Sequence, residues 1–407
     1  MKKNREKIKT LFIDSGKGYG GTASFLFYML GCIDMRKFEP SVAFYYFNNM
    51  SYTRKIADLG IPVFFLNSYP EPADYVPFKW LLKNSGPWLL QKIKVILRLL
   101  LRMITVEIPL IRKTRELIKR GGVELVILNN DVHYHLAGTV AAHISGIPCI
   151  CRKAGGINEG GLIKKILTPY VDLFIAVSRA TTEDQVKNSP ATKRLVTIYE
   201  GISLDIYNDS DVPAHRSAVR RELHIPDSRK VVGNISRFVE GKGQAEILQA
   251  ASMIIRSYQE VVFLMVGDGE SMDALKEQAN RLNLGDHVIF TGWRDDIQSI
   301  LAATDIFVHC PTTFLEGLGI ANLEAMAMGK PSVVSDNGGL PDAVLDGVTG
   351  YVVPVGDVQE LTGAILKLLR DERLSEKLGG NARDRIRKEF DIKQNARKLE
   401  DVFSAYA

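Results

Sequence analysis

Two carboxylates, Glu316 and Glu324, bracket a glycine-bearing turn in the run EGLGIANLE. The AMAMGKP that follows predicts a helix that stops at its glycine and proline. Glu316 then lies in the loop and Glu324 in the opening turns of the helix. Glu324 can accept two hydrogen bonds from a ribose diol, and Glu316 can do the same for hexose hydroxyls. Free backbone N–H groups near a helix N-terminus favour a phosphate or a developing anion; here they belong to Leu318, Gly319 and Ile320.

A second candidate is the polar loop SRFVEGKG, which follows the strand-like run KVVGNIS at 230–236. Arg237 and Lys242 would lie at the carboxyl end of that strand and beside a helix start. Two fixed cations there suit a diphosphate, and they would stabilise the charge that leaves with it when a bond is cleaved. Taken alone, the motif reads as a solvated basic loop.

A third candidate, the glycine loop at 16–21, follows the first strand-like run. Glycines let the backbone approach a phosphate or a sugar closely, and Thr22 can cap the next helix. A single glycine loop is weak evidence for a phosphate or sugar site. It supports such a site only in combination with the other two motifs.

Short apolar runs alternate with helical patterns along the chain, which predicts parallel sheets covered by helices on both faces. A strand, a glycine-bearing loop and a helix occur near the amino terminus and again from residue 230, which indicates two doubly wound halves. We place the boundary near residue 200, followed by a polar connection to about His215. Facing Rossmann-like domains put the ligand in the inter-domain cleft. Examples of the strand-like runs are 9–14, 40–47, 125–128, 148–151, 173–178, 230–236, 261–267, 287–292, 306–310 and 331–336.

The segment 88–105 does not fit this alternation. On a helix, one stripe is polar and basic and includes Lys94, Arg98 and Arg102, while the wide remaining face is apolar. Such a helix can dock on an anionic membrane surface. It can equally pack its apolar face on the amino-terminal domain, and periodicity alone does not separate the two.

The composition is that of a globular protein, with 407 residues, 46% hydrophobic and 24% charged. The net charge of +5 is too small to indicate nucleic-acid binding, and no zinc-knuckle spacing accompanies it. The four cysteines form no CxxC motif and are expected to be reduced and mostly buried. No apolar run is long enough for a transmembrane helix. The basic amino terminus runs into a strand and a glycine loop, so we expect no signal peptide.

In this order the three candidate motifs resemble those of the retaining glycosyltransferases of family 4, which have the GT-B fold. The likeness covers nearly the whole chain and is highly specific over 230–355 but loose over 1–200. The residues that carry it are GYGGT (18–22), SRFVEGKG, VGDGES (266–271), TGWRDDI (291–297) and the run 316–354 that begins EGLGIANLE.

The resemblance implies a role for each matched residue. Arg237 and Lys242 would hold the diphosphate, Glu324 the ribose and Glu316 the transferred sugar, which makes Arg237, Lys242 and Glu316 the catalytic candidates. Attack on the front face through an oxocarbenium-like state would retain configuration. No cofactor or metal would be needed, because the two cations neutralise the leaving group. Further donor contacts would come from Gly20, Gly21, Gly267, Asp268, Trp293, Arg294, Leu318, Gly319 and Ile320.

The resemblance also implies the domain organisation. Residues 1–200 would form the acceptor-side domain, completed by a C-terminal helix at 389–407. Residues 201–388 would bind the nucleotide sugar.

The sequence departs from the family pattern in two places. Many members carry a histidine after the GIP strand, but here the stretch 151–156 reads CRKAGG. The second departure is Asp342, where glutamate is usual and where we expect a structural role. The candidates for the acceptor side are Asn130, Asp131, His133, Arg152, Lys153 and Asn158.

The sequence therefore predicts a retaining hexosyltransferase that uses a nucleotide-sugar donor. The segment 88–105 favours a lipid-linked or envelope glycan as acceptor. The reduced cysteines favour a cytoplasmic enzyme, free or on the inner face of the cytoplasmic membrane. The alternatives are a nucleotide-sugar epimerase, a glycosyl phosphorylase, a non-catalytic nucleotide-sugar-binding protein and a dinucleotide oxidoreductase. The glycine spacing 16–18–21 fits the last, but no acidic residue ends a following second strand.

Overall fold

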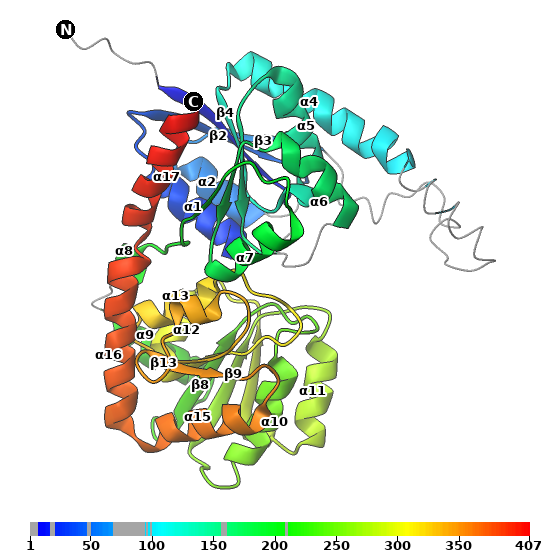
Figure 1. The fold of residues 1–407 in the computed structure, drawn as a ribbon. Coiled ribbons are helices and arrows are strands. Elements are labelled where there is room, and N and C mark those ends of the chain that lie inside the picture. The colour runs from blue at the N-terminus through cyan, green and yellow to red at the C-terminus, as the bar shows by residue number, and fades with distance from the viewer. Residues whose placement is uncertain are drawn as a thin grey trace. The chain divides into compact units, whose positions relative to one another are not determined.

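The structure is a computed structural model that describes residues 7–16, 21–46, 50–67, 94, 97, 100–155, 161–207 and 211–407. The chain divides into two compact units (Figure 1). Unit 1 comprises Met1–Ala176, Thr182–Ile198 and Ala396–Ala407. Unit 2 comprises Val177–Thr181 and Tyr199–Asn395.

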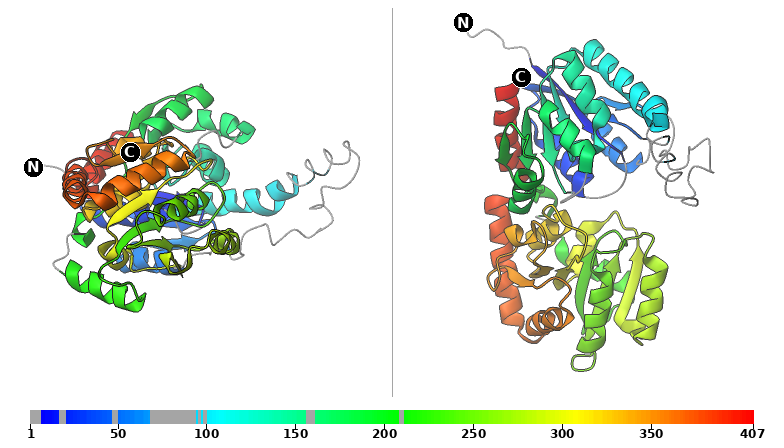
Figure 2. Two further views of the ribbon diagram at one scale, coloured as in Figure 1. Left: turned by 90° about the horizontal axis from the view of Figure 1, so that it is seen from below. Right: turned by 45° about the vertical axis from the view of Figure 1, so that its right-hand side comes forward.

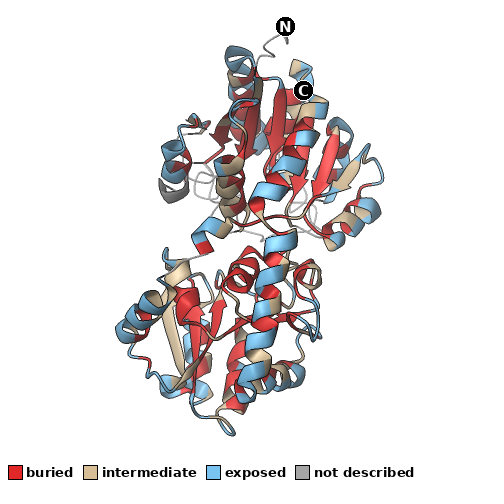
Figure 3. Cartoon of the chain, turned by 90° about the vertical axis from the view of Figure 1, so that its left-hand side faces the viewer, coloured by how far each residue is buried: buried red, intermediate tan, exposed pale blue. Residues whose placement is uncertain are grey.

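Unit 1 is built on a seven-stranded parallel sheet of order β3-β2-β1-β4-β5-β6-β7. The central strands of the sheet are almost entirely buried (Figure 3), as expected for a sheet with helices on both faces. The order reverses between β1 and β4, and ligands of such sheets bind at the carboxyl ends of the strands beside this reversal. The strands are β1 Ile8–Asp14, β2 Phe38–Phe44, β3 Val63–Phe65, β4 Leu125–Leu128, β5 Cys149–Lys153, β6 Leu173–Ala176 and β7 Leu195–Thr197.

The last helix of the chain, α17 (Ile392–Tyr406), covers the first strands of unit 1. Its Phe403 ring meets the rings of Phe12 and Phe38 at centroid distances of 6.0 and 6.3 Å. The other helices of unit 1 are α1 Gly21–Cys32, α2 Met50–Asp58, a π-helical turn Met103–Glu107, α4 Ile108–Gly121, the 3-10 turn Val132–Tyr134, α5 Leu136–Ser145, α6 Gly161–Leu167, the 3-10 turn Thr168–Tyr170 and α7 Arg179–Asn188, whose first turn belongs to unit 2.

Unit 2 is built on a six-stranded parallel sheet of order β10-β9-β8-β11-β12-β13. Its order reverses between β8 and β11, so the loops after these two strands share one edge of the sheet. The strands are β8 Lys230–Ile235, β9 Val261–Val266, β10 Val288–Gly292, β11 Ile306–His309, β12 Ser332–Ser335 and β13 Gly350–Val353.

Helices pack on both faces of the unit 2 sheet (Figure 2). One core cluster joins the strands to α10 (Gln244–Ile254), α11 (Met272–Arg281) and α15 (Val358–Arg370). A second, smaller cluster joins them to α9 (Val212–Glu222) and α12 (Ile297–Ala303). The remaining helices are α8 Leu204–Tyr207, the 3-10 turn Gly285–His287, α13 Ile320–Ala327, α14 Leu340–Ala343 and α16 Glu372–Glu389.

The polar connection expected up to His215 is shorter than predicted. Val212 already begins α9, and His215 Nδ1 lies 2.6 Å from the Ser299 hydroxyl of α12. The three arginines and the glutamate of VPAHRSAVRRE obscure the narrow apolar stripe that packs this helix on unit 2.

Most of the segment 88–105 lies outside the described residues. The described positions 94, 97 and 100–105 are all helical. Across the ranges that the structure describes, no helix combines the length and the apolarity that crossing a bilayer requires.

Candidate active site

Two loops at the carboxyl edge of the unit 2 sheet are locked together by glycines. Gly241 and Gly243 belong to the loop after β8 and have φ angles of 82° and 83°. A Cβ at Gly243 would overlap the backbone carbonyl of Cys310, which follows β11, and one at Gly241 would overlap the Thr313 hydroxyl. The N–H of Thr312 also donates to the Gly241 carbonyl at 2.8 Å. The β8 loop is therefore held against the chain that leads to Glu316.

Lys242, Glu316 and His309 meet where these loops touch. The Lys242 ammonium forms an ion pair with Glu316 Oε1, and the same oxygen lies 3.0 Å from His309 Nε2. Lys242 Nζ also lies 3.6 Å from the centroid of the Phe314 ring, a cation–π contact. His309 is the last residue of β11, so the strand itself points its side chain at the carboxylate.

The environment of Glu316 keeps it ionised. Burial by itself would raise the pKa of this carboxyl group. The charge of Lys242 and the hydrogen bond with His309 outweigh burial and bring the pKa of Glu316 well below its usual range. The site thus presents a fixed cation and a fixed anion side by side.

The backbone of Glu316 is anchored by the loop after β12. Its N–H donates to Asn337 Oδ1 at 3.2 Å, and its carbonyl accepts from the Gly339 N–H at 3.0 Å. A Cβ at Gly338 would overlap the same carbonyl. These contacts fix the turn that carries the carboxylate.

The turn leads directly into α13, as the sequence predicted. Gly319 is the N-cap with φ 82°, and a Cβ there would lie 2.6 Å from Leu340 Cδ2. The side chains of Leu318 and Ile320 are buried in the core, so only their backbone amides can reach a ligand. Glu324 lies within α13 and is largely buried.

Arg237 differs from Lys242 in its surroundings. Its side chain is exposed, and the described part of the chain gives its guanidinium no ion pair. Its loop is held by the turn after β9, because the Phe238 N–H donates to the Asp268 carbonyl at 2.9 Å. A Cβ at Gly267 would overlap the Ser236 carbonyl. Gly267 and Asp268 therefore position the arginine-bearing loop, and the exposed Asp268 carboxylate accepts from the Gly269 N–H.

The two residues expected beside the nucleotide base are not equivalent. Trp293 is 47% exposed, and its indole N–H donates to Asp295 at 3.3 Å. Arg294 is engaged by two carboxylates, at 2.7 Å from Asp296 and 3.0 Å from Glu222, and these hydrogen bonds raise its pKa further. The structure assigns Arg294 to holding α9 and α12 together. Trp293 is the better placed of the two to stack on a base.

The glycine loop of unit 1 is described only at its ends. Gly20 lies outside the described residues, and Gly21 begins α1. Gly16 has φ 72°, and its N–H donates to Asp14 Oδ1 at 2.8 Å. The other Asp14 oxygen accepts from Asn129 at 2.6 Å, and burial raises the pKa of Asp14. Asp14 was not among the predicted site residues. The sequence feature that could have identified it is an acidic residue at the end of a buried first strand.

The proposed acceptor-side residues of unit 1 fall into two groups. Asp131 and Lys153 have fully buried side chains joined by a 2.8 Å ion pair, so neither is arranged to meet a hydroxyl, contrary to expectation. Arg152 is also buried, with its guanidinium 4.3 Å from the Phe25 ring centroid and its Nε 3.1 Å from Asn129 Oδ1. Asn130 and His133 are partly exposed. Asn158 lies outside the described residues.

Asp342 has the structural role that was expected of it. Its carboxylate accepts the Arg179 N–H at 2.6 Å, at the first residue of α7. A shorter side chain than glutamate suffices for this contact.

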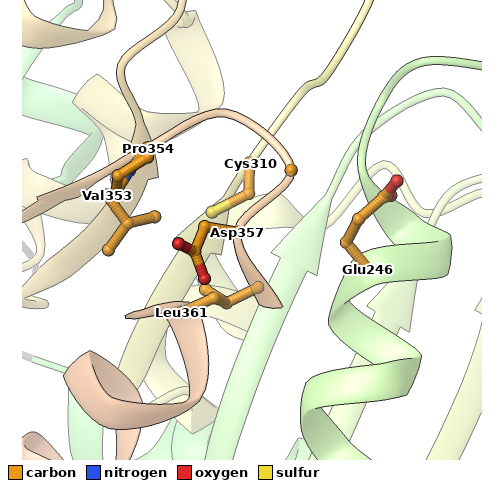
Figure 4. A pocket seen from close by; sticks show the side chains of 7 residues that line it. Glu246, Cys310, Val353, Pro354, Asp357 and Leu361 are labelled. Atoms are coloured by element: carbon orange, nitrogen blue, oxygen red, sulfur yellow. The ribbon is translucent and has the colours of Figure 1, made fainter. Parts of the chain in front are cut away.

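A small cavity beside the site contains the thiol of Cys310 (Figure 4). Glu246 from α10 and the β13–α15 connection line the rest of it. Burial raises the pKa of Cys310, so its thiol stays protonated. Asp357 is engaged as the N-cap of α15, where it accepts two backbone N–H groups. All four cysteines are free, and only Cys32 is not buried.

Comparisons with known proteins agree with this architecture. Residues 215–385 match the model of the family Glycosyl transferases group 1. N-acetyl-alpha-D-glucosaminyl L-malate synthase of Bacillus anthracis is 28% identical over 57% of this chain and 59% of its own length. UDP-Gal:alpha-D-GlcNAc-diphosphoundecaprenol alpha-1,3-galactosyltransferase of Escherichia coli is 27% identical over 67% of this chain and 74% of its own.

A solved structure extends the likeness over both units. The crystal structure of Anabaena Alr3699/HepE in complex with UDP-glucose matches 98% of this chain and 100% of its own with a TM-score of 0.80, at 24% sequence identity. That likeness establishes the GT-B fold, with one Rossmann-like parallel sheet in each unit. The family match over residues 215–385 and the relatives support the assignment to glycosyltransferase family 4.

Proposed function

We propose that the protein is a retaining glycosyltransferase that moves a hexose from a nucleotide-diphosphate sugar to the hydroxyl of an acceptor glycan. One observation carries the proposal: Lys242, Glu316 and His309 meet at the carboxyl ends of β8 and β11, beside the N-terminus of α13. A cation, a hydroxyl-binding carboxylate and free backbone amides at one sheet edge are the groups that a sugar diphosphate needs.

The proposed chemistry breaks the bond between the sugar C1 and the diphosphate oxygen. The electron pair leaves with the diphosphate, and Lys242, Arg237 and the α13 amides would stabilise that charge without a metal ion. The acceptor oxygen bonds to C1 on the same face, through an oxocarbenium-like state, and its proton passes to the departing phosphate oxygen. Glu316 would hold the hexose hydroxyls, Glu324 the ribose, and Trp293 the base.

The names of the relatives support a class of donor and acceptor. The Escherichia coli relative is named for transfer from UDP-Gal to a diphosphoundecaprenol-linked sugar, and the Anabaena protein was solved with UDP-glucose. We propose a UDP- or GDP-hexose as donor and a lipid-linked or envelope glycan as acceptor. The chain spans 59% of the length of the Bacillus anthracis relative, whose name indicates a small acceptor instead.

The helical positions 94, 97 and 100–121 support contact with an anionic membrane. They expose apolar side chains near the start of the range, including Ile104 at 64%, and cations along its length. Such a combination favours binding at a bilayer surface. The exposed apolar residues are Leu97, Leu100, Met103, Ile104 and Ile108, and the exposed cations are Arg102, Arg112, Lys113, Arg115, Lys119 and Arg120.

Co-sedimentation with anionic liposomes tests the membrane contact. Changing Lys94, Arg98 and Arg102 to Glu should abolish sedimentation. The same number of charge reversals on unit 2, at Lys276, Arg281 and Lys377, should leave it intact. Unchanged sedimentation of the first variant would remove the membrane proposal and leave the enzymatic one standing.

A thermal-shift screen against UDP-, GDP-, ADP- and dTDP-sugars tests the donor, followed by a hydrolysis assay on each hit. One nucleotide family should raise the melting temperature, because a ligand that binds only the folded state stabilises it. The shift should vanish in Glu324→Ala and persist in Glu376→Ala, an exposed change on α16. A shift with a nicotinamide dinucleotide alone would overturn the proposal.

A further inference from the structure

Four charged side chains form a closed cluster inside unit 1. Lys153 Nζ lies 2.8 Å from Asp131 Oδ2 and 2.7 Å from Asp184 Oδ2. Lys164 Nζ lies 3.2 Å from each of the same two oxygens. Every side chain in the cluster is at most 2% exposed. Each ammonium therefore contacts both carboxylates, and the four charges sum to zero.

The cluster gathers segments from the carboxyl ends of three neighbouring strands. Asp131 follows β4, Lys153 ends β5, and Asp184 lies on α7, which follows β6. Lys164 lies on α6, between β5 and β6. The cluster therefore fixes the edge of the sheet at which folds of this kind bind their ligands.

Stability alone does not account for four buried charges. Removing charges from water costs several kcal/mol per ion, and replacing a buried ion pair by apolar residues of similar volume is often neutral or stabilising. The mutual contacts do keep the charges in place: the pKa of Asp131 is lowered and that of Lys153 is raised to about 12, against the effect of burial. Such a network instead fixes the segments that it joins in one defined arrangement.

One segment that it arranges carries His133. The second oxygen of Asp131, Oδ1, lies 3.7 Å from His133 Nδ1. The imidazole also lies against Tyr134, with ring centroids 3.9 Å apart. Asp131 thus binds two lysines with one oxygen, and its other oxygen faces the Nδ1 edge of His133. His133 and Tyr134, which lie next to the cluster, are accessible from the surface.

We propose that Asp131, Lys153, Lys164 and Asp184 are positioning residues that hold His133 in place for the acceptor hydroxyl. This inference rests on the proposed function and deepens it, because it names the group that serves the acceptor in place of the missing family histidine. The cluster then governs how the enzyme uses its acceptor and leaves the donor site of unit 2 unaffected.

The test separates donor use from acceptor use. Lys164→Met with Asp184→Asn removes one charge of each sign and keeps the cluster neutral. Hydrolysis of the nucleotide sugar without acceptor reports on the donor site. Transfer to a water-soluble short-chain N-acetylglucosaminyl diphospholipid reports on the acceptor. The ratio of transfer to hydrolysis should fall about tenfold or more, since small misplacements of reacting groups carry such costs. The KM for the donor should change by less than about twofold.

A mutant cycle with His133→Gln distinguishes positioning from general destabilisation. If the cluster acts through His133, His133→Gln alone should lower the ratio as much as the double change, and the triple variant should add nothing. Phe403→Leu, which loosens the core of the same unit, should leave the ratio at the wild-type value. Losses that multiply in the triple variant would overturn the inference.

A milder change covers the case in which the double variant does not fold. Asp184→Glu keeps the charge and shifts the carboxylate by one methylene, and the same cycle with His133→Gln applies to it. An active wild-type enzyme whose ratio is unchanged in Asp184→Glu and in the double variant would refute the positioning role alone. A wild-type protein that neither hydrolyses nor transfers from any nucleotide sugar would overturn the proposed function, and this inference with it.

Discussion

The Lys242 ammonium bonds to the Glu316 carboxylate across 74 residues of sequence, and His309 bonds to the same oxygen. The residue proposed for the diphosphate and the residue proposed for the sugar are therefore direct partners. A donor that engages both must replace part of this ion pair with its own oxygens and hydroxyls. The pair also holds both side chains in position, which reduces the conformational ordering that donor binding requires.

The first prediction concerns acid stability. The pKa of Glu316 lies below its usual value of 4.5 in the folded protein. Its ionised form therefore contributes stability that is fully present above about pH 5 and is lost as the pH falls below 4.5. In Glu316→Gln the free energy of unfolding should depend less on pH over that range. Urea unfolding at pH 7 and pH 4 measures the difference, and Glu376→Gln should behave as the wild type does.

The second prediction concerns the two cations. Arg237→Ala and Lys242→Ala should each lower turnover by well over tenfold, because each removes a preorganised charge from the leaving group. Arg237 is exposed, so its loss should change the free energy of unfolding by no more than about 0.5 kcal/mol. Steady-state hydrolysis of the donor gives the turnover. Arg256→Ala, another exposed arginine of unit 2, is the control. Near-normal turnover in both variants would mean that the diphosphate binds elsewhere.

The third prediction compares two glycines of unit 2. Gly243→Ala would place a Cβ on the Cys310 carbonyl at a left-handed backbone position, so it should destabilise by about 2 kcal/mol or more. Gly363 lies exposed on α15 with nothing within 4 Å of a new Cβ. Gly363→Ala should stabilise the helix by up to about 1 kcal/mol. Thermal unfolding of the two variants gives the sign of each change, and equal signs would contradict the packing described here.

The fourth prediction concerns α17. Phe403→Ala removes a buried ring from contact with Phe12 and Phe38 and should cost about 3–5 kcal/mol. Denaturant unfolding followed by a probe in unit 1 measures this. Lys398→Ala, on the same helix and exposed, should have a small effect. A Phe403→Ala variant as stable as Lys398→Ala would exclude a structural role for this ring.

Long apolar runs made most of the fold predictable. The run 125–128 coincides with β4, and the runs at 230, 261 and 306 begin at the first residues of β8, β9 and β11. The predicted runs did not include β3, β7 and β13. β3 and β7 have only three residues each, too few for a periodic pattern to stand out. Edge strands such as β3 and β7 also tolerate exposed residues, which weakens the apolar signal further.

The site was predictable where its residues are neighbours in sequence and obscure where they are not. The turn from Glu316 into α13 follows from local glycine and helix rules. The ion pair of Glu316 with Lys242, and the roles of His309 and Asn337, depend on strand order, which no local pattern contains. His309 did carry one signal, as a polar residue at the carboxyl end of a buried strand beside the site.

Ion pairs within the protein overturned two expectations in unit 1 and engage a third predicted residue in unit 2. Asp131 and Lys153 were expected at the acceptor, but each neutralises the other inside the protein. Arg294 was expected at the base, but Glu222 and Asp296 engage it. The sequence does not distinguish a charged side chain that binds a ligand from one that forms an ion pair inside the protein. The partner in such an ion pair is distant in sequence and becomes apparent only in the folded structure.

Through its contacts with Phe12 and Phe38, Phe403 of the last helix belongs to the same hydrophobic core as the first strands of the chain. During synthesis the ribosome delivers residues 12 and 38 long before residue 403. Unit 2, which is interrupted only by 182–198, emerges almost whole before then. The two units should therefore mature in the reverse of their order in the sequence. Until the last helix arrives, the first strands keep an apolar face uncovered, and in the cell this face would be a natural binding site for a chaperone.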